Sequence, residues 1–192
     1  MCAAMDENSW HRPDQAPGPQ DQWEQRHVGG LDMGWSGWAV TNGPVVIRSA
    51  KEQDLDSLHV LDKEVFGILA YPFFTLRQLL DLHARHCLLA DDGTGLVGYC
   101  LGAVAAAPRI GWLLGLGVTP KLRGGGYGRD LARETLRRIR EDGARRVQLA
   151  VEPNNDPAIH LYESLGFRVI EYRADYYGPR ADRLIMSAPG SG

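Results

Sequence analysis

The sequence predicts a single α/β domain built on a mixed sheet of about seven strands, and three observations support this prediction. The chain has 192 residues, of which 44% are hydrophobic, and this size suits one compact domain plus an appendage. Segments with strand patterns and segments with helix patterns alternate along most of the chain. In addition, a glycine-rich turn links an apolar, strand-like segment to a long amphipathic helix.

Residues 1–43 differ from the rest of the chain and are predicted to be a disordered leader. They mix Pro, Gly, Gln and Asp without strand or helix periodicity, so they cannot bury enough apolar surface to offset the cost of ordering. Six acids outnumber two bases there, and four of the five tryptophans lie in this segment. The alternative is an arm in which Trp35 and Trp38 dock on the domain or on a partner subunit. The folded domain is expected to span residues 44–190.

Bulk composition excludes several classes of protein. A formal net charge of −3 and a pI near 6.1 argue against a general nucleic-acid binder. The three cysteines make no disulfide framework and lack the spacing of a zinc site. The domain histidines, including His83 and His86, form no metal-ligand set and are expected on helix surfaces, so no metal is predicted. Because neither an export signal nor a membrane-spanning segment is evident, we expect a cytoplasmic protein without a membrane partner.

The first half of the domain is predicted to contain a strand, two helices and a hairpin. A β-branched run at 45–48 predicts the first strand. Apolar residues then recur at helical spacing from Leu55 to Phe66. A second helix is expected to begin with Thr75 as its N-cap and to reach about residue 83. Residues 87–90 and 96–104 flank an Asp-Asp-Gly-Thr-Gly loop, which is typical of a hairpin with a longer loop.

The second half is predicted to continue as strand, helix, strand, helix and two closing strands. The expected ranges are a strand over 110–118, a long helix over about 126–141, a strand over 147–151, a short helix over 157–165, and strands over 167–172 and 184–188.

The turn between residues 118 and 129 has the character of a diphosphate-binding site. Its four glycines allow the backbone to approach a ligand closely, and the amides at the start of the following helix favour an anion. No Lys-Ser or Lys-Thr pair follows, which excludes a P-loop, and the preceding meander excludes a dinucleotide-binding unit. Taken alone, the glycine cluster also fits a flexible turn.

Two motifs in this region resemble those of the GNAT superfamily of acyl-CoA-dependent N-acyltransferases. Arg123, Gly126 and Gly128 match the family signature of Arg or Gln, two residues, Gly, one residue, and Gly or Ala. Residues 155–167 resemble the second signature, which contains an asparagine, a helix with Leu-Tyr, and Leu-Gly-Phe. The resemblance spans about residues 45–188, and the C-terminal third is most similar to bacterial ribosomal-protein (N-terminal alanine) acetyltransferases. It implies a GNAT fold, with a mixed twisted sheet splayed at the CoA site and helices on both faces.

The resemblance implies acetyl-CoA as the cosubstrate. The backbone of residues 116–118 would pair with the pantetheine arm, and the amides of residues 124–129 would bind the diphosphate. Nine bases against four acids between Lys121 and Arg146 suit this phosphorylated ligand, although most of these arginines also suit a solvated helix face. Asn155 equally suits an ordinary helix start. The residues expected to bind the cosubstrate are Leu116, Gly117, Val118, Arg123, Gly124, Gly125, Gly126, Tyr127, Gly128, Arg129 and Asn155.

For the chemistry, Tyr162 matches the family tyrosine near the thioester sulfur, where a phenol can protonate the leaving thiolate. The alternative is a core tyrosine with a satisfied hydroxyl. The glutamate that those acetyltransferases carry five residues before the asparagine is replaced here by Ala150. Glu152 shares the face of Ala150 by strand alternation and is the expected catalytic base, acting through water; the alternative is a solvated strand-end carboxylate.

The acceptor is expected to be an α-amine. Such an amine has a pKa of about 7.7 to 8.0, against about 10.4 for lysine, so it needs a weaker base. Tyr71, before Pro72, resembles the aromatic-Pro wall of the acceptor pocket in N-terminal acetyltransferases, and Tyr176 and Tyr177 resemble their Tyr-Tyr-Pro loop. Surface turns would explain both segments equally well.

The function predicted from the sequence is direct transfer of an acetyl group from acetyl-CoA to a primary amine in a ternary complex, with a protein or peptide N-terminus as acceptor. A small-molecule amine, such as an antibiotic or an amino-acid derivative, is one alternative. A non-catalytic CoA-binding regulatory module is another. The sequence leaves open a homodimer and the range of acyl chains.

Overall fold

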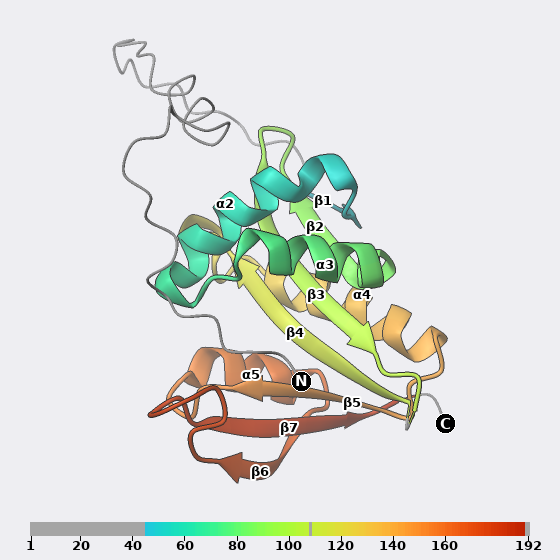
Figure 1. The fold of residues 1–192 in the computed structure, drawn as a ribbon, viewed down its shortest axis with the longest axis vertical. Coiled ribbons are helices and arrows are strands. Elements are labelled where there is room, and N and C mark those ends of the chain that lie inside the picture. Colours follow the sequence, from blue (N-terminus) through green and yellow to red (C-terminus); the bar gives the residue numbers. More distant parts are fainter. Residues whose placement is uncertain (1–44, 108, 191–192) are drawn as a thin grey trace, which may run out of the picture. The chain divides into compact units, whose positions relative to one another are not determined.

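The computed structural model describes residues 45–107 and 109–190, which form an open seven-stranded sheet (Figure 1). The predicted leader, with its tryptophans, lies outside the described residues. The strands follow the order β1-β2-β3-β4-β5-β7-β6, and only β4 and β5 run parallel. This confirms the predicted mixed sheet. The strands are β1 (Val46–Ser49), β2 (Cys87–Asp91), β3 (Leu96–Val104), β4 (Ile110–Val118), β5 (Arg146–Val151), β6 (Arg168–Arg173) and β7 (Arg183–Pro189).

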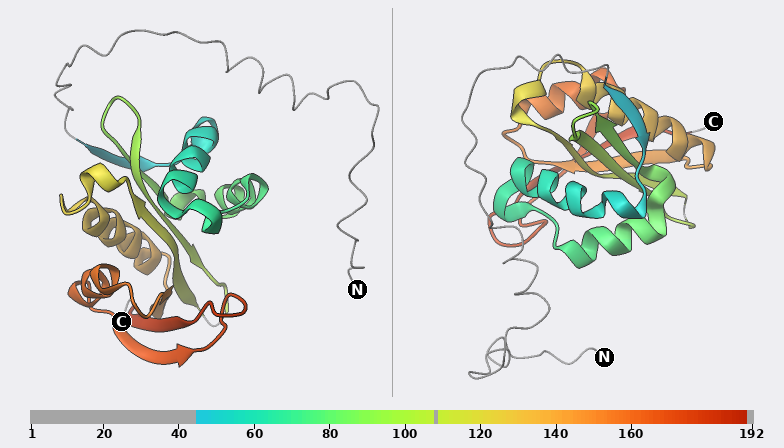
Figure 2. Two further views of the ribbon diagram at one scale, coloured as in Figure 1. Left: turned by 90° about the vertical axis from the view of Figure 1, so that its left-hand side faces the viewer. Right: turned by 90° about the horizontal axis from the view of Figure 1, so that it is seen from above.

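Helices cover both faces of the sheet, as Figure 2 shows. The pair α2 (Leu55–Phe66) and α3 (Phe73–His83) packs on one face, and α4 (Tyr127–Glu141) and α5 (Asp156–Ser164) pack on the other. Four 3₁₀ turns join these elements: η1 (Glu52–Asp54), η2 (Gly67–Leu69), η3 (Ala84–His86) and η4 (Pro120–Leu122). Among the described helices, none is both long enough and apolar enough to cross a membrane.

The two faces of the sheet bury separate apolar clusters. Side chains alternate along a strand, so Leu88 packs toward α4 while its neighbour Leu89 packs toward α2 and α3. Cys100 and Leu101 divide in the same way on β3. This two-sided burial explains why β2 and β3 carry continuous apolar runs in the sequence.

Several element boundaries differ from the prediction. The second helix begins at Phe73, so Thr75 is not its N-cap. Pro72 occupies that position with an extended backbone (φ −54°, ψ 144°), and its carbonyl accepts hydrogen bonds from the amides of Thr75 and Leu76. Proline suits this position because its ring fixes φ near −65°. The sixth strand begins one residue later than predicted, because Phe167 is buried in the core.

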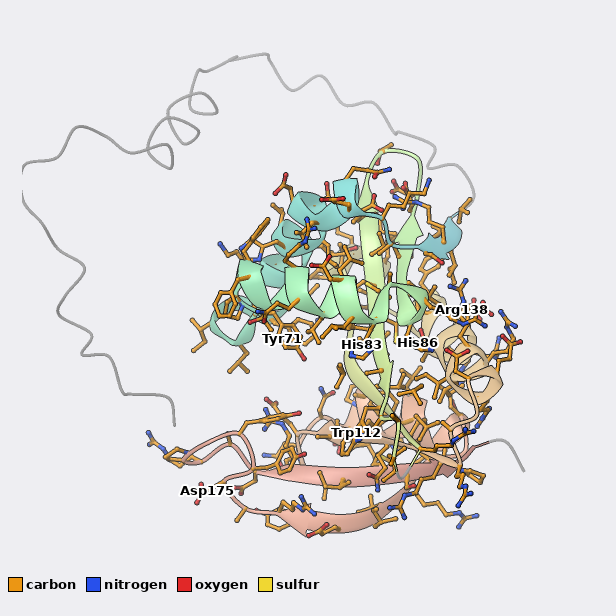
Figure 3. All side chains as sticks on the ribbon, turned by 45° about the vertical axis from the view of Figure 1, so that its right-hand side comes forward. Tyr71, His83, His86, Trp112, Arg138 and Asp175 are labelled. Carbon is orange, nitrogen blue, oxygen red and sulfur yellow. The ribbon has the colours of Figure 1, made fainter. Side chains whose placement is uncertain are left out.

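His86 is another correction, because it is buried rather than exposed on a helix surface. It lies in η3 with 6% of its surface exposed, and its Nε2 lies 2.9 Å from Asp142 Oδ2 at the end of α4. Figure 3 shows His86 beside Arg138. Burial outweighs the attraction of Asp142 and lowers the pKa of His86. Within residues 45–107 and 109–190, no group of three or more His, Cys, Asp or Glu side chains is placed to hold a metal ion.

The strands β4 and β5 separate partway along their length. They pair only from Ile110 with Arg146 to Leu113 with Leu149, whereas β4 pairs with β3 as far as Val118. A bulge in the β3–β4 ladder leaves Leu114 as an extra residue on β4. Residues 114–118 therefore present an edge without a β5 partner, which we call the open edge of β4.

Candidate active site

The glycine-rich turn leads from the open edge of β4 into α4. After η4, Gly124 and Gly126 both have left-handed backbones, with φ of +82° and +87°. Nothing lies within 4 Å of the position that a Cβ would take at either residue, so the turn exposes backbone on an open surface. Gly126 is the N-cap of α4. Left-handed geometry explains why glycine suits these two positions.

The first turn of α4 presents free amide donors next to this surface. The first bond inside the helix runs from the amide of Asp130 to the carbonyl of Gly126, at 3.1 Å. The amides of residues 127–129 precede that bond and therefore have no acceptor within the helix. Together with the helix dipole, these amides form a site that favours an anion.

The basic residues around the turn play different roles. Arg123 is exposed, and its Nε donates a hydrogen bond to the carbonyl of Val118 at 3.2 Å, which joins the turn to the end of β4. Arg129 is also exposed. Further along α4, Arg133, Arg137 and Arg138 form ion pairs with acids of the same helix. The solvated helix face is therefore the correct interpretation for Arg133 and Arg137, whereas the Arg138 side chain is only 19% exposed and also donates to Ser49 Oγ and to the carbonyl of Arg85.

Tyr162 lies on the α4 side of the sheet. It lies on α5, partly buried against the core, and its ring packs edge-to-face on Phe167 at 5.8 Å. Burial, with a smaller contribution from Cys100, raises the pKa of Tyr162 well above its ordinary value. Its phenol therefore stays protonated at neutral pH and can donate a proton.

Asn155 is the N-cap of α5. Its Oδ1 accepts a hydrogen bond from the amide of Ala158 at 3.2 Å, so the helix-start interpretation is confirmed. The side-chain NH₂ group is not required for this cap. The Asn155 side chain can therefore cap α5 through its Oδ1 and still have its NH₂ group available for a contact with the cosubstrate.

Glu152 lies just beyond β5, on the opposite face from Tyr162. Its carboxylate is 52% exposed and lies 3.6 Å from Arg183 Nη2 on β7. The Arg183 guanidinium is stacked on the ring of Tyr177, 4.9 Å from its centroid, and Tyr177 packs against Tyr176 at 4.8 Å. The fold thus gathers Glu152 and both predicted tyrosines of the β6–β7 loop around Arg183.

Tyr71 lies across from this group, at the end of the α2–α3 layer that faces β6 and β7 (Figure 3). Its hydroxyl donates a hydrogen bond to the carbonyl of Leu114 on the open edge of β4, at 3.0 Å. Burial, followed by the charges of Tyr177 and Asp62, raises the pKa of Tyr71 to about 12. Tyr71 therefore stands beside the β4–β5 separation.

Sequence reasoning missed Asp62 and Tyr99, which are both fully buried beside Tyr71. Asp62 Oδ2 accepts a hydrogen bond from the amide of Tyr71 at 2.6 Å, and its Oδ1 accepts one from the hydroxyl of Tyr99. One signal was available in the sequence. Asp62 stands four residues after Leu58 and four before Phe66, so it places an acid on the apolar stripe of α2.

A glycine-rich turn with free helix amides, an open strand edge and a partly buried phenol lie in the part of the chain that also matches a model of a transferase family. The model of the Acetyltransferase (GNAT) family matches residues 53–167, and the chain belongs to that family. It is an acetyltransferase with the open, seven-stranded GNAT sheet.

Two relatives match most of this chain. An N-alpha-acetyltransferase from Sulfurisphaera tokodaii is 27% identical over 165 residues, which cover 74% of this chain and 92% of the relative. A putative ribosomal protein bS18-alanine N-acetyltransferase from Bacillus subtilis is 26% identical over 141 residues, which cover 73% of this chain and 92% of the relative. A mycothiol acetyltransferase from Nocardiopsis dassonvillei is 40% identical, but over only 73 residues, 38% of this chain and 22% of the relative.

Solved structures share the fold. The ribosomal-protein-S18-alanine N-acetyltransferase from Escherichia coli has a TM-score of 0.68 at 23% identity, with 77% of this chain and 95% of that chain covered.

Proposed function

We propose that this protein acetylates the α-amino group of a protein or peptide N-terminus, with acetyl-CoA as the donor. The observation that carries the proposal is the hydrogen bond that holds the Tyr71 hydroxyl on the carbonyl of Leu114, at the open edge of β4. Tyr71, Tyr176 and Tyr177 would form the walls that receive the amine. Tyr162 would reach the same opening from the other face of the sheet.

The residues around the turn fit the donor. The amides of residues 124–129 and the guanidinium groups of Arg123 and Arg129 would hold its phosphates. The backbone of Leu116, Gly117 and Val118, free on the β5 side, would pair with its pantetheine arm. When bound there, acetyl-CoA supplies a thioester whose carbonyl carbon is the target of the amine.

Tyr162 would protonate the departing sulfur. Its raised pKa keeps the proton on the phenol until a thiolate, which is a stronger base, forms beside it. Direct transfer is also supported by the cysteines. Burial raises the pKa of Cys87 and of Cys100 to about 12, so neither is a thiolate that could carry the acetyl group at neutral pH.

The amine must lose a proton before it attacks. Glu152 would accept that proton through water, because its exposed carboxylate lies on the face of Ala150 at the rim of the β4–β5 separation. Such a distant base is weak, which suits an α-amine better than a lysine ε-amine. Two relatives, each matched over about three quarters of this chain, are named an N-alpha-acetyltransferase and a putative ribosomal protein bS18-alanine N-acetyltransferase, which supports this acceptor.

The test compares peptides that differ only in which amine is free. Purified protein is incubated with acetyl-CoA and a peptide library that varies the first residue. A second set carries a blocked α-amine and a free internal lysine. Release of CoA thiol and the mass of the product are measured. We expect product only from the peptides with a free α-amine. Equal rates with the blocked set would overturn the proposal.

A second acceptor class, small-molecule amines, is favoured by the mycothiol acetyltransferase match of 40% identity. That match covers about a fifth of the relative, so it says little about the acceptor side. The same assay with a panel of amino-sugar and amino-acid amines separates the two classes. Faster thiol release with such an amine than with any peptide would favour this second function.

A further inference from the structure

Asp62 is an acidic side chain on the apolar face of α2, and none of its surface is exposed. A leucine at this position would complete the apolar stripe, whereas a buried carboxyl group loses its hydration and is stable only when hydrogen bonded. Its two oxygens accept hydrogen bonds from the Tyr71 amide, at 2.6 Å, and from the Tyr99 hydroxyl. The Tyr71 amide and the Tyr99 hydroxyl therefore both depend on Asp62 for a hydrogen-bond acceptor.

Tyr71 is held at both ends. Its amide is bonded to Asp62, and its hydroxyl is bonded to the carbonyl of Leu114, the bulge residue of β4. The amide bond ties Tyr71 back to α2, and the hydroxyl bond ties it to a strand 43 residues further along the chain. The ring is therefore fixed over the part of β4 where the strand leaves β5.

Tyr99 packs on the same stretch of β4. A Cβ at Gly117 would lie 3.1 Å from the Tyr99 ring and 3.2 Å from Phe66, and a Cβ at Gly115 would lie 3.3 Å from the Tyr99 hydroxyl oxygen. The two glycines thus allow the ring to lie against the strand. Asp62 bonds to both tyrosines that cover the open edge, but touches neither the turn nor α4.

We propose that Asp62 is a positioning residue for acetyl transfer. It fixes Tyr71 against Leu114 and so shapes the wall that receives the acceptor amine. This inference rests on the proposed function, which assigns that wall to the acceptor. It predicts that removal of the Asp62 acceptor oxygens weakens use of the acceptor while use of acetyl-CoA stays intact.

The experiment compares Asp62→Leu with Asp62→Asn. Leucine keeps the volume but accepts no hydrogen bond. Asparagine can accept from the Tyr71 amide through Oδ1 and donate through its NH₂ to the Tyr99 oxygen, because a hydroxyl group both donates and accepts. We expect Asp62→Leu to raise the acceptor KM about tenfold, with the KM for acetyl-CoA within about twofold of wild type. The acceptor KM of Asp62→Asn should stay close to the wild-type value.

Leu80→Ala is the matched control for lost stability. Leu80 is buried in the same cluster on α3, so its truncation loosens this core without removing a partner of Tyr71. Equal rises in acceptor KM for Leu80→Ala and Asp62→Leu would overturn the proposal, as would an Asp62→Asn protein as impaired as Asp62→Leu. If Asp62→Leu does not fold, Tyr71→Phe serves instead, because it removes the bond to Leu114 that Asp62 is proposed to support; an unchanged acceptor KM in that variant counts against the proposal.

A second measurement does not need an acceptor. Hydrogen exchange of the Tyr71 amide reports directly on its bond to Asp62. We expect exchange about tenfold faster in Asp62→Leu, relative to the amides of β3 and β4, and near wild type in Asp62→Asn. Unchanged exchange in Asp62→Leu would overturn the positioning role. If no peptide is acetylated by the wild-type protein but exchange responds as expected, the acceptor assignment fails while the Asp62 to Tyr71 link stands.

Discussion

The ring of Tyr162 and the ring of Phe167 meet edge-to-face, with centroids 5.8 Å apart and planes at 65°. The amide of Phe167 also donates a hydrogen bond to the carbonyl of Tyr162, at 3.0 Å. Both contacts cross the end of α5, so the Leu-Gly-Phe segment braces the residue that we propose as the proton donor. The ring is held by apolar packing, which leaves the hydroxyl free for chemistry.

Tyr162→Phe should therefore remove activity without removing stability. We expect kcat to fall by about 10²- to 10⁴-fold, the usual contribution of a general acid. The free energy of unfolding should stay within about 0.5 kcal/mol of wild type, because the ring contact is kept. Thiol release and denaturant unfolding measure the two quantities. Tyr172→Phe, on the exposed strand β6, is the control and should keep its activity. Full activity in Tyr162→Phe would mean that another group protonates the sulfur.

Alanine at Gly124 or Gly126 should weaken donor binding. The left-handed backbone costs an L-residue about 1 to 2 kcal/mol, and relaxation of that strain would move the amides that we propose to bind the phosphates. Gly93→Ala is the matched control, since Gly93 has φ of +86° and equally open surroundings, but lies in the β2–β3 hairpin. All three variants should lose similar stability. Only the first two should raise the acetyl-CoA KM, by about tenfold; an equal rise in Gly93→Ala would refute this assignment.

Glu152→Gln tests the water-mediated base. At pH 7 an α-amine is mostly protonated, so removal of the base should lower kcat/KM by about tenfold. Near pH 9 the amine is already neutral, and the deficit should shrink. Glu163→Gln, on the exposed face of α5, controls for the change of charge. A deficit that is the same at both pH values would indicate that Glu152 orients the acceptor and does not take its proton.

His86 should make the fold less stable in mild acid. Burial lowers its pKa from the ordinary value of 6.5, despite the opposing effect of Asp142. Below pH 6.5 the unfolded chain therefore binds a proton that the folded chain does not, and the free energy of unfolding decreases as the pH falls. Urea unfolding between pH 7.5 and pH 5.5 measures this slope. His86→Gln should flatten it, and His160→Gln on exposed α5 should not. An unchanged slope in His86→Gln would assign the acid sensitivity to other groups.

The sequence by itself determined the order of the strands and helices along the chain, the glycine-rich turn between β4 and α4, and the place of Tyr162 on a short helix. These features are local. Apolar periodicity, a helix N-terminus and a short glycine motif each act over a few residues, so they can be recognised without knowledge of what packs against them. The start of α3 was predicted wrongly, because Thr75 is a common N-cap residue type and only the backbone geometry shows that Pro72 occupies the cap.

The tertiary structure alone decided which distant groups meet. Tyr71 reaches Leu114 across 43 residues and Asp62 reaches Tyr99 across 37, and His86 is buried because η3 packs at the end of α4. No local pattern encodes such pairs, because they depend on how helices and strands far apart in the chain pack on a shared sheet. Tyr71, Tyr176 and Tyr177 could be named from local motifs, but the bonds that fix Tyr71 to Leu114 and to Asp62 belong to this second group.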